Sequence, residues 1–251
     1  MLIQMFYMSK LPNAPLVEVI FEIRWNSSDK ANLDKFQLLI GAMYSALKGK
    51  FPSFINLKPD SNMPDAAFIG MPTHRFTSNN VYPMYQLGPG VLSVNMINSN
   101  YVWEYFLNTI NDVVNVFEHL SELQGQQVTL ALKYIDFFKC KFSEIDLSQY
   151  ISDNFHLCVS APYLSNKKSK TFSYATTMDV DMGLLTLTMN TGYNNIEGQQ
   201  VEGIITESNI SNSFSFEGLN SYIKDQLPSA HELLGTFFKE LTEGTLYNSF
   251  K

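Results

Sequence analysis

Cysteine and charge are both scarce in this 251-residue sequence. Its two cysteines, Cys140 and Cys158, have a spacing that matches no metal-binding motif. Two thiols in a chain of this length indicate a reducing compartment and no disulfide framework. Charged residues make up 16% of the chain and hydrophobic residues 45%, which excludes an intrinsically disordered polypeptide.

Long apolar runs are absent as well. No stretch approaches the roughly 18 uninterrupted apolar residues of a membrane-spanning helix, so we expect no membrane association. The start, Met1–Met8, is apolar but brief, and it lacks the basic lead and the small-residue cleavage site of a signal peptide. The protein is therefore predicted to be cytoplasmic.

Positive charge is too sparse for a general affinity for nucleic acid. The formal net charge is −7, which gives no electrostatic support for binding a polyanion. Six of the 17 basic residues do cluster in sequence, and we interpret them as parts of a solvated face and loop. They are Lys133, Lys139, Lys141, Lys167, Lys168 and Lys170. Nucleic acid is not an expected partner.

Recognisable catalytic and cofactor-binding motifs are also missing. The sequence has no Gly-Lys-Ser/Thr loop, no Gly-x-Ser-x-Gly elbow and no Cys–His pairing. Its four histidines lie far apart, and His119 and His231 fall at expected helix ends, where we interpret them as surface or capping residues. We expect no cofactor and no metal, and whether the chain is an enzyme stays open.

The clearest structural pattern lies between Gln86 and Leu120. Gly88-Pro89-Gly90 is typical of a tight turn, and Val91–Asn98 alternates apolar and polar residues as a strand does. A helix is predicted over Asn100–Leu120, because its apolar residues recur at steps of three and four. They are Trp103, Phe106, Ile110, Val113, Phe117 and Leu120.

The other segments extend this unit on both sides. Strands are predicted at Val17–Trp25, Val81–Leu87, Val128–Phe142, Phe155–Ala161, Thr171–Val180, Leu184–Gly192 and Val201–Ile210, with a short one at Ala66–Gly70. Helices are predicted at residues 29–50 and 144–151, and after a capping box at Ser229–Glu232. This order indicates an α+β fold with two halves, each an antiparallel or mixed sheet covered by helices on one side. The halves would be residues 1–143 and 144–251, as two domains or one continuous domain.

Four stretches resemble a known family. They are Asn13–Arg24, Tyr82–Asn95, Tyr101–Phe106 and Leu132–Asp136. They are similar to a sporadically distributed prokaryotic family of conserved hypothetical proteins of similar length. The resemblance covers roughly residues 1–140, and an arginine often stands in that family at the position of Lys133. It implies a cytoplasmic protein that folds as a single unit, and it implies no particular chemistry.

Asp136 is the most unusual residue of the predicted strands. It lies between Tyr134 and Phe138 on the apolar face of Val128–Phe142. A carboxylate there must be paired, hydrogen-bonded or protonated. Two interpretations stay open: an acid with a perturbed pKa in a pocket, or a carboxylate held by backbone amides or by Arg24 where the strand bends.

A second polar group lies on the first predicted strand. Glu18, Glu22 and Arg24 share its polar face, and they would meet Ser93 and Asn95 if the two strands pair. A solvated sheet face is the alternative interpretation. Five residues are therefore candidates for binding a ligand: Glu22, Arg24, Asn95, Lys133 and Asp136.

Two functions are compatible with these patterns. The first is a non-catalytic binding or interaction module with a protein partner, which the missing catalytic motifs favour. The second is an enzyme or small-ligand binder whose pocket lies between the two halves and uses Asp136, Glu22 and Arg24. A cavity reached by both Asp136 and Arg24 would favour the second.

Overall fold

The computed structural model describes residues 11–158 and 169–251. The stretch Met1–Met8 and two of the clustered lysines, Lys167 and Lys168, therefore lie outside the described residues. So does the second half of the predicted strand Phe155–Ala161, whose first residue, Phe155, ends a helix instead. Cys140 and Cys158 both carry free thiols.

The described strands form one antiparallel sheet of nine strands in the order β2-β3-β4-β5-β1-β6-β9-β8-β7. Their bounds are β1 Leu16–Trp25, β2 Ser53–Asn56, β3 His74–Thr77, β4 Met84–Gly88, β5 Val91–Ile97, β6 Gln127–Lys139, β7 Ser173–Val180, β8 Gly183–Ile196 and β9 Gln199–Ser215. Tight hairpins join β4 to β5, β7 to β8 and β8 to β9, and the turn between β4 and β5 is formed by Pro89–Gly90.

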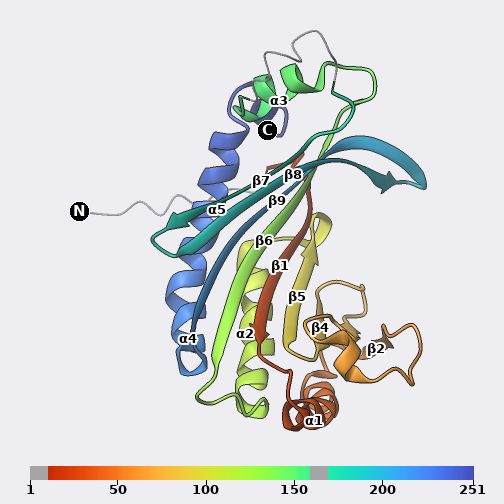
Figure 1. Ribbon diagram of the computed structural model, residues 1–251, viewed down its shortest axis with the longest axis vertical. Coiled ribbons are helices and arrows are strands. Elements are labelled where there is room, and N and C mark those ends of the chain that lie inside the picture. Colours follow the sequence, from red (N-terminus) through yellow and green to blue (C-terminus); the bar gives the residue numbers. More distant parts are fainter. Residues whose placement is uncertain (1–10, 159–168) are drawn as a thin grey trace.

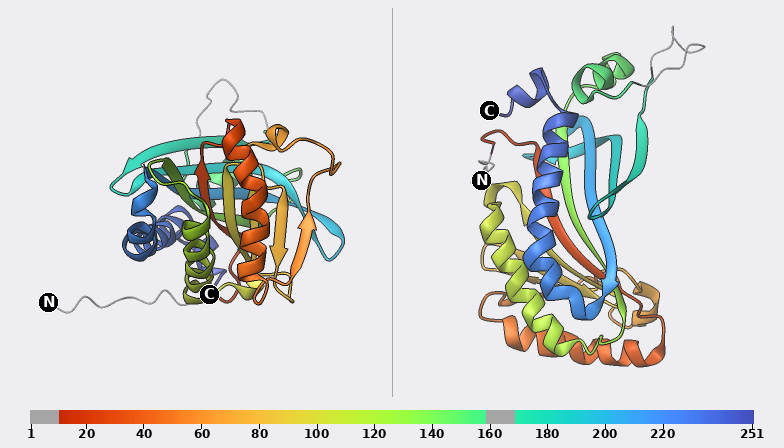
Figure 2. Two further views of the ribbon diagram at one scale, coloured as in Figure 1. Left: turned by 90° about the horizontal axis from the view of Figure 1, so that it is seen from below. Right: turned by 90° about the vertical axis from the view of Figure 1, so that its left-hand side faces the viewer.

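The helices are α1 Lys30–Leu47, α2 Trp103–Leu120, α3 Leu147–Phe155, α4 Leu219–Ser221, α5 Leu227–Leu241 and α6 Thr245–Asn248, with short helical turns at Asp65–Phe68, Asn98–Asn100, Phe216–Gly218 and Tyr222–Gln226. Helices α2 and α5 lie along one face of the sheet, and α3 lies at the end of the sheet opposite to α1 (Figure 1 and Figure 2). Figure 1 looks onto the opposite face, so that α2 and α5 are seen behind the strands. Figure 2 (right) shows α5 and α2 against the sheet and α1 across its lower end. We call the opposite side of the sheet the open face.

The core lies between the helices and the sheet because each element buries its apolar side there. Val19, Phe21 and Ile23 of β1 are fully buried, as are Phe106 and Ile110 of α2. The predicted alternation of β1 is therefore confirmed, and the predicted helical stripe of α2 is confirmed from Phe106 to Phe117, whereas Leu120 at its end is 37% exposed. A smaller buried cluster packs around Phe138 near α3 and the C-terminus.

The predicted α+β class is confirmed, but the division into two sheets is not. Strand β6 pairs with β9 from Gln127↔Ser215 to Lys139↔Gly203, and on its other edge it pairs with β1. The two halves therefore share one sheet. This pairing joins segments that are far apart in the sequence, so no local pattern in either segment could reveal it.

Three local predictions are wrong. Ala66–Gly70 is not a strand, because Asp65–Phe68 forms a helical turn. Helix α2 begins at Trp103 and not at Asn100, because Asn98–Asn100 forms a separate helical turn. The capping box at Ser229–Glu232 lies inside a helical run that already starts at Leu219, since the turns over Leu219–Gln226 lead directly into α5.

Candidate functional site

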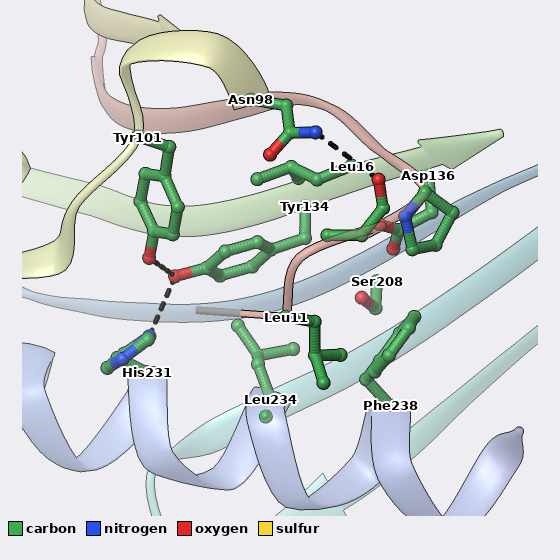
Figure 3. A pocket seen from close by; sticks show the side chains of 13 residues that line it. Leu11, Leu16, Asn98, Tyr101, Tyr134, Asp136, Ser208, His231, Leu234 and Phe238 are labelled. Carbon is green, nitrogen blue, oxygen red and sulfur yellow. Dashed lines mark hydrogen bonds between the residues drawn. The ribbon is translucent and has the colours of Figure 1, made fainter. Parts of the chain in front are cut away.

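A partly enclosed cavity of about 130 Å³ lies between the sheet and helix α5 (Figure 3). Its wall is mainly apolar, formed by Leu11, Ala14, Pro15, Leu16, Leu234 and Phe238. Its polar side chains are Asn98, Tyr101, Tyr134, Asp136, Ser208 and His231. The apolar and polar lining residues together come from the lead-in to β1, the start of β1, the turn before α2, strands β6 and β9, and α5. The cavity is therefore assembled from segments spread over the whole chain.

The periodicities of β6 and α5 explain how the cavity is lined. Alternation along β6 directs Tyr134 and Asp136 to the helix side of the sheet, between the buried residues Leu132 and Phe138. In α5, His231, Leu234 and Phe238 are spaced by three and four residues, so they share one face of the helix. Figure 3 shows these three side chains directed toward the sheet.

Asp136 is the buried carboxyl group of the cavity. The residue is only 5% exposed, and its carboxylate accepts no hydrogen bond from the described residues. Burial disfavours its charged form and raises the pKa of Asp136 to about 7. Its location in the wall of the cavity corresponds to the first of the two interpretations, an acid with a perturbed pKa in a pocket.

The predicted ion pair between Asp136 and Arg24 is wrong. In the register of β1 with β6, Arg24 lies opposite Thr129, whereas Asp136 lies opposite Leu16. The two positions are thus separated by seven residues of strand, which is roughly 23 Å. Arg24 also points to the open face, where both of its contacts to Glu22 form: Nε to Oε1 at 2.6 Å and Nη2 to Oε2 at 3.1 Å.

Three of the other candidate residues join Arg24 on the open face. Lys133 Nζ lies 3.1 Å from Glu22 Oε1, so Glu22 contacts two cations. Burial acts to raise the pKa of Glu22, but Arg24 and Lys133 outweigh it, and the pKa is lowered. Asn95 donates from Nδ2 to Glu18 Oε1 at 2.9 Å. This cluster is satisfied by its own members, so it stabilises the sheet without requiring a ligand.

The sheet separates these residues into two groups. Glu22, Arg24, Asn95 and Lys133 are brought together, and Asp136 lies on the other side among the helix-facing residues. No single pocket contains Asp136, Glu22 and Arg24. The side chain of Asp136 projects from the helix side of the sheet, and those of Glu22 and Arg24 project from the open face.

A hydrogen-bonded chain of three side chains closes one end of the cavity. The hydroxyl oxygens of Tyr101 and Tyr134 are 2.6 Å apart, and Tyr134 Oη is 2.8 Å from His231 Nδ1 (Figure 3). The His231 ring also stacks on Trp103, with ring centroids 4.0 Å apart. Burial lowers the pKa of His231 to about 4 and raises the pKa of Tyr134 well above its ordinary value. Both groups are therefore neutral at neutral pH.

The interpretation of His231 as a surface or capping residue is wrong. Its place in the α5 stripe with Leu234 and Phe238 is a signal that could have identified it as inward-facing. Ser208 was missed in the same way, although it lies between Thr206 and Ile210 on the buried side of β9. His119, in contrast, is exposed at the end of α2, as predicted.

Ser208, His231 and Asp136 line one cavity but do not form a catalytic triad. His231 is bonded to Tyr134, and no hydrogen bond joins it to Ser208 or Asp136 among the described contacts. Figure 3 shows His231 at one end of the cavity and both Asp136 and Ser208 at the other. Nucleophilic catalysis requires a nucleophile within hydrogen-bonding distance of its base. Ser208 and His231 lie at opposite ends of the cavity and do not form this contact.

Comparison with known proteins gives no further assignment. No protein-family model, no curated protein and no solved structure matches this chain. The family resemblance and the predicted cellular location therefore stay predictions. Within residues 11–158 and 169–251, no helix is long and apolar enough to cross a bilayer. The same residues contain no group of three or more His, Cys, Asp or Glu side chains placed to hold a metal ion.

Proposed function

We propose that this protein is a non-catalytic binding protein that takes one small, largely apolar ligand into the cavity between α5 and the sheet. The observation that carries the proposal is an apolar cavity of about 130 Å³ with a buried carboxyl group in its wall. Ligand pockets are characteristically apolar, with a few polar groups that fix orientation.

The size of the cavity sets the size of the ligand. An engineered apolar cavity of about 150 Å³ accepts benzene, so this cavity matches a molecule built on one ring or on a short branched chain. Leu234 and Phe238 of α5 and Leu16 of β1 provide the apolar contacts for it.

Binding is favoured over catalysis because the polar groups of the cavity lack the contacts of a reacting set. His231 is neutral and already bonded to Tyr134, and the carboxyl of Asp136 is not bonded to a nucleophile among the described residues. A protein partner, predicted from the sequence, stays a prediction, because the polar cluster of the open face is internally satisfied and indicates no particular partner.

Benzyl alcohol is a suitable first probe, since it combines one ring with one hydroxyl group. Saturation-transfer NMR should detect its binding, with a dissociation constant in the range of about 1 μM to 1 mM. The variant Ala14→Leu places extra carbon atoms in the cavity and should weaken binding strongly.

The matched control is Ala42→Leu. Ala42 lines a separate cavity of about 110 Å³ beside α1, which also includes Leu39 and Leu123. This variant should leave binding of benzyl alcohol unchanged. Equal losses of benzyl alcohol binding in both variants would contradict the proposed function.

A further inference from the structure

The carboxyl group of Asp136 is a buried acid for which the described fold supplies no counter-charge. It is 95% buried, and it lies on the wall of an apolar cavity instead of inside close-packed core. An unpaired buried charge is costly, so proteins normally pair such a group or keep it neutral. Here the space next to the carboxylate is a cavity, which leaves room for a partner that is not part of the chain.

The nearest titratable groups cannot neutralise Asp136. Tyr134 from β6 and Tyr101 from the turn before α2 are neutral phenols, and His231 from α5 is a neutral imidazole bonded to Tyr134. Strand β9 contributes Ser208 and Thr206, which carry no charge. None of the described residues that line the cavity is a lysine or an arginine.

The cations on the neighbouring strands are engaged elsewhere. Lys133 precedes Tyr134 on β6, but its side chain projects from the open face of the sheet, where it pairs with Glu22. Arg24 pairs with the same carboxylate. The sheet thus places Arg24 and Lys133 on one face and the unpaired acid on the other, and Lys139, the last residue of β6, is exposed and does not line the cavity.

We infer that the ligand of this cavity carries a protonated amine, which pairs with the Asp136 carboxylate while the apolar part of the ligand packs against Leu234 and Phe238. This inference rests on the proposed function. An organic monocation fits better than a metal ion, because the described residues offer Asp136 no second and third acidic, histidine or cysteine ligand. Charge-assisted hydrogen bonds to a carboxylate are also roughly twice as strong as neutral ones.

Two probes of nearly equal shape separate this inference from the proposed function. Benzylamine and benzyl alcohol differ in one group, an ammonium in place of a hydroxyl. At pH 8, where most of Asp136 is ionised, calorimetry or NMR titration should give benzylamine an affinity at least about tenfold higher than that of benzyl alcohol. In Asp136→Asn, the ratio of the two affinities should fall to about one.

The pH dependence of the wild-type protein provides a second measurement, in case Asp136→Asn does not fold. The affinity for benzylamine should rise from pH 5 to pH 8 as Asp136 loses its proton, because an alkylamine, like lysine with a pKa of about 10.4, stays protonated over this range. The affinity for benzyl alcohol should change much less.

Each result decides a different point. Equal affinities for the two probes in the wild-type protein would overturn the amine inference and leave the proposed function standing. A preference for benzylamine that persists in Asp136→Asn, or that is independent of pH, would overturn Asp136 as the recognising group. Failure of both probes to bind would overturn the proposed function itself.

Discussion

The hydroxyl oxygen of Tyr134 lies 2.8 Å from Nδ1 of His231, and this contact connects strand β6, next to the middle strand of the sheet, to helix α5. The same hydroxyl lies 2.6 Å from that of Tyr101, which precedes α2. One phenol thus connects the sheet to both long helices that cover it. The contact also holds His231 at one end of the cavity, away from Asp136 at the other.

Replacing Tyr134 with phenylalanine should therefore destabilise the fold. Tyr134→Phe keeps the ring but leaves the buried polar atoms of Tyr101 and His231 without their shared partner, which costs about 1–3 kcal/mol. Urea denaturation should show a lower midpoint with an unchanged slope. Tyr105→Phe is the control, because Tyr105 is half exposed. Equal midpoints for the two variants would show that the hydrogen-bonded chain contributes nothing to stability.

Asp136 should make the protein less stable as the pH rises. Its pKa is about 7 in the folded protein, above the ordinary value of 3.8, so the folded state holds the proton more tightly than the unfolded state. The stabilisation that protonated Asp136 contributes is fully present below pH 3.8 and is lost as the pH rises toward 7. The loss in the free energy of unfolding is at most about 4 kcal/mol.

Comparing Asp136→Asn with the wild-type protein isolates this effect. His231 has the opposite dependence, since its folded pKa of about 4 lies below 6.5 and stability falls as the pH falls through that window. Its contribution cancels in the difference between the two proteins at each pH. The stability of Asp136→Asn relative to wild type should increase from pH 4 to pH 7 and then level off. A difference that is constant with pH would mean that Asp136 is solvated.

Glu22 should stabilise the open face of the sheet through its two cations. Glu22→Gln removes the charge that Arg24 and Lys133 share, and at pH 7 it should cost about 1–3 kcal/mol. Because the folded pKa of Glu22 is lowered, this stabilisation is present above its ordinary value of 4.5 and is lost as the pH falls through the folded value.

Glu144→Gln is the matched control for this prediction. Glu144 pairs with Lys141, but both side chains are mostly exposed. Exposed pairs of this kind contribute about 0–1 kcal/mol, so the control should be nearly neutral in chemical denaturation. A loss of equal size in both variants would contradict the special role of Glu22.

Two glycines should respond to alanine in opposite directions. A Cβ atom added to Gly88, at the β4–β5 turn, would lie 1.9 Å from the carbonyl oxygen of Met71, so Gly88→Ala should unfold or severely destabilise the protein. Gly41 lies within α1 with no atom in the way of a Cβ, and Gly41→Ala should stabilise the helix by about 0.5–1 kcal/mol. Thermal denaturation would test both, and a tolerated Gly88→Ala would contradict the close packing of this turn.

Local patterns in the sequence predicted much of the sheet and the faces of its strands. The alternation along β6 correctly indicated that Asp136 points into apolar surroundings, since that pattern depends only on neighbouring residues. The glycine-proline turn before β5 and the apolar stripe of α2 were equally local and equally informative.

Partners across the sheet could not be predicted in this way. The placement of Arg24 opposite Thr129 depends on the register of β1 with β6, which no pattern within either strand defines. The contact of Tyr134 with His231 likewise joins residues 97 positions apart. The candidate site is made of such contacts, so the sequence indicated its acid but not its enclosing residues.

A crystal structure of the protein soaked with benzylamine would show whether Asp136 recognises an amine. We predict that the ring lies in the cavity against Leu234 and Phe238, with the amine nitrogen about 2.7–2.9 Å from a carboxylate oxygen of Asp136. An empty cavity at saturating benzylamine, or a bound molecule with its nitrogen directed away from Asp136, would contradict it.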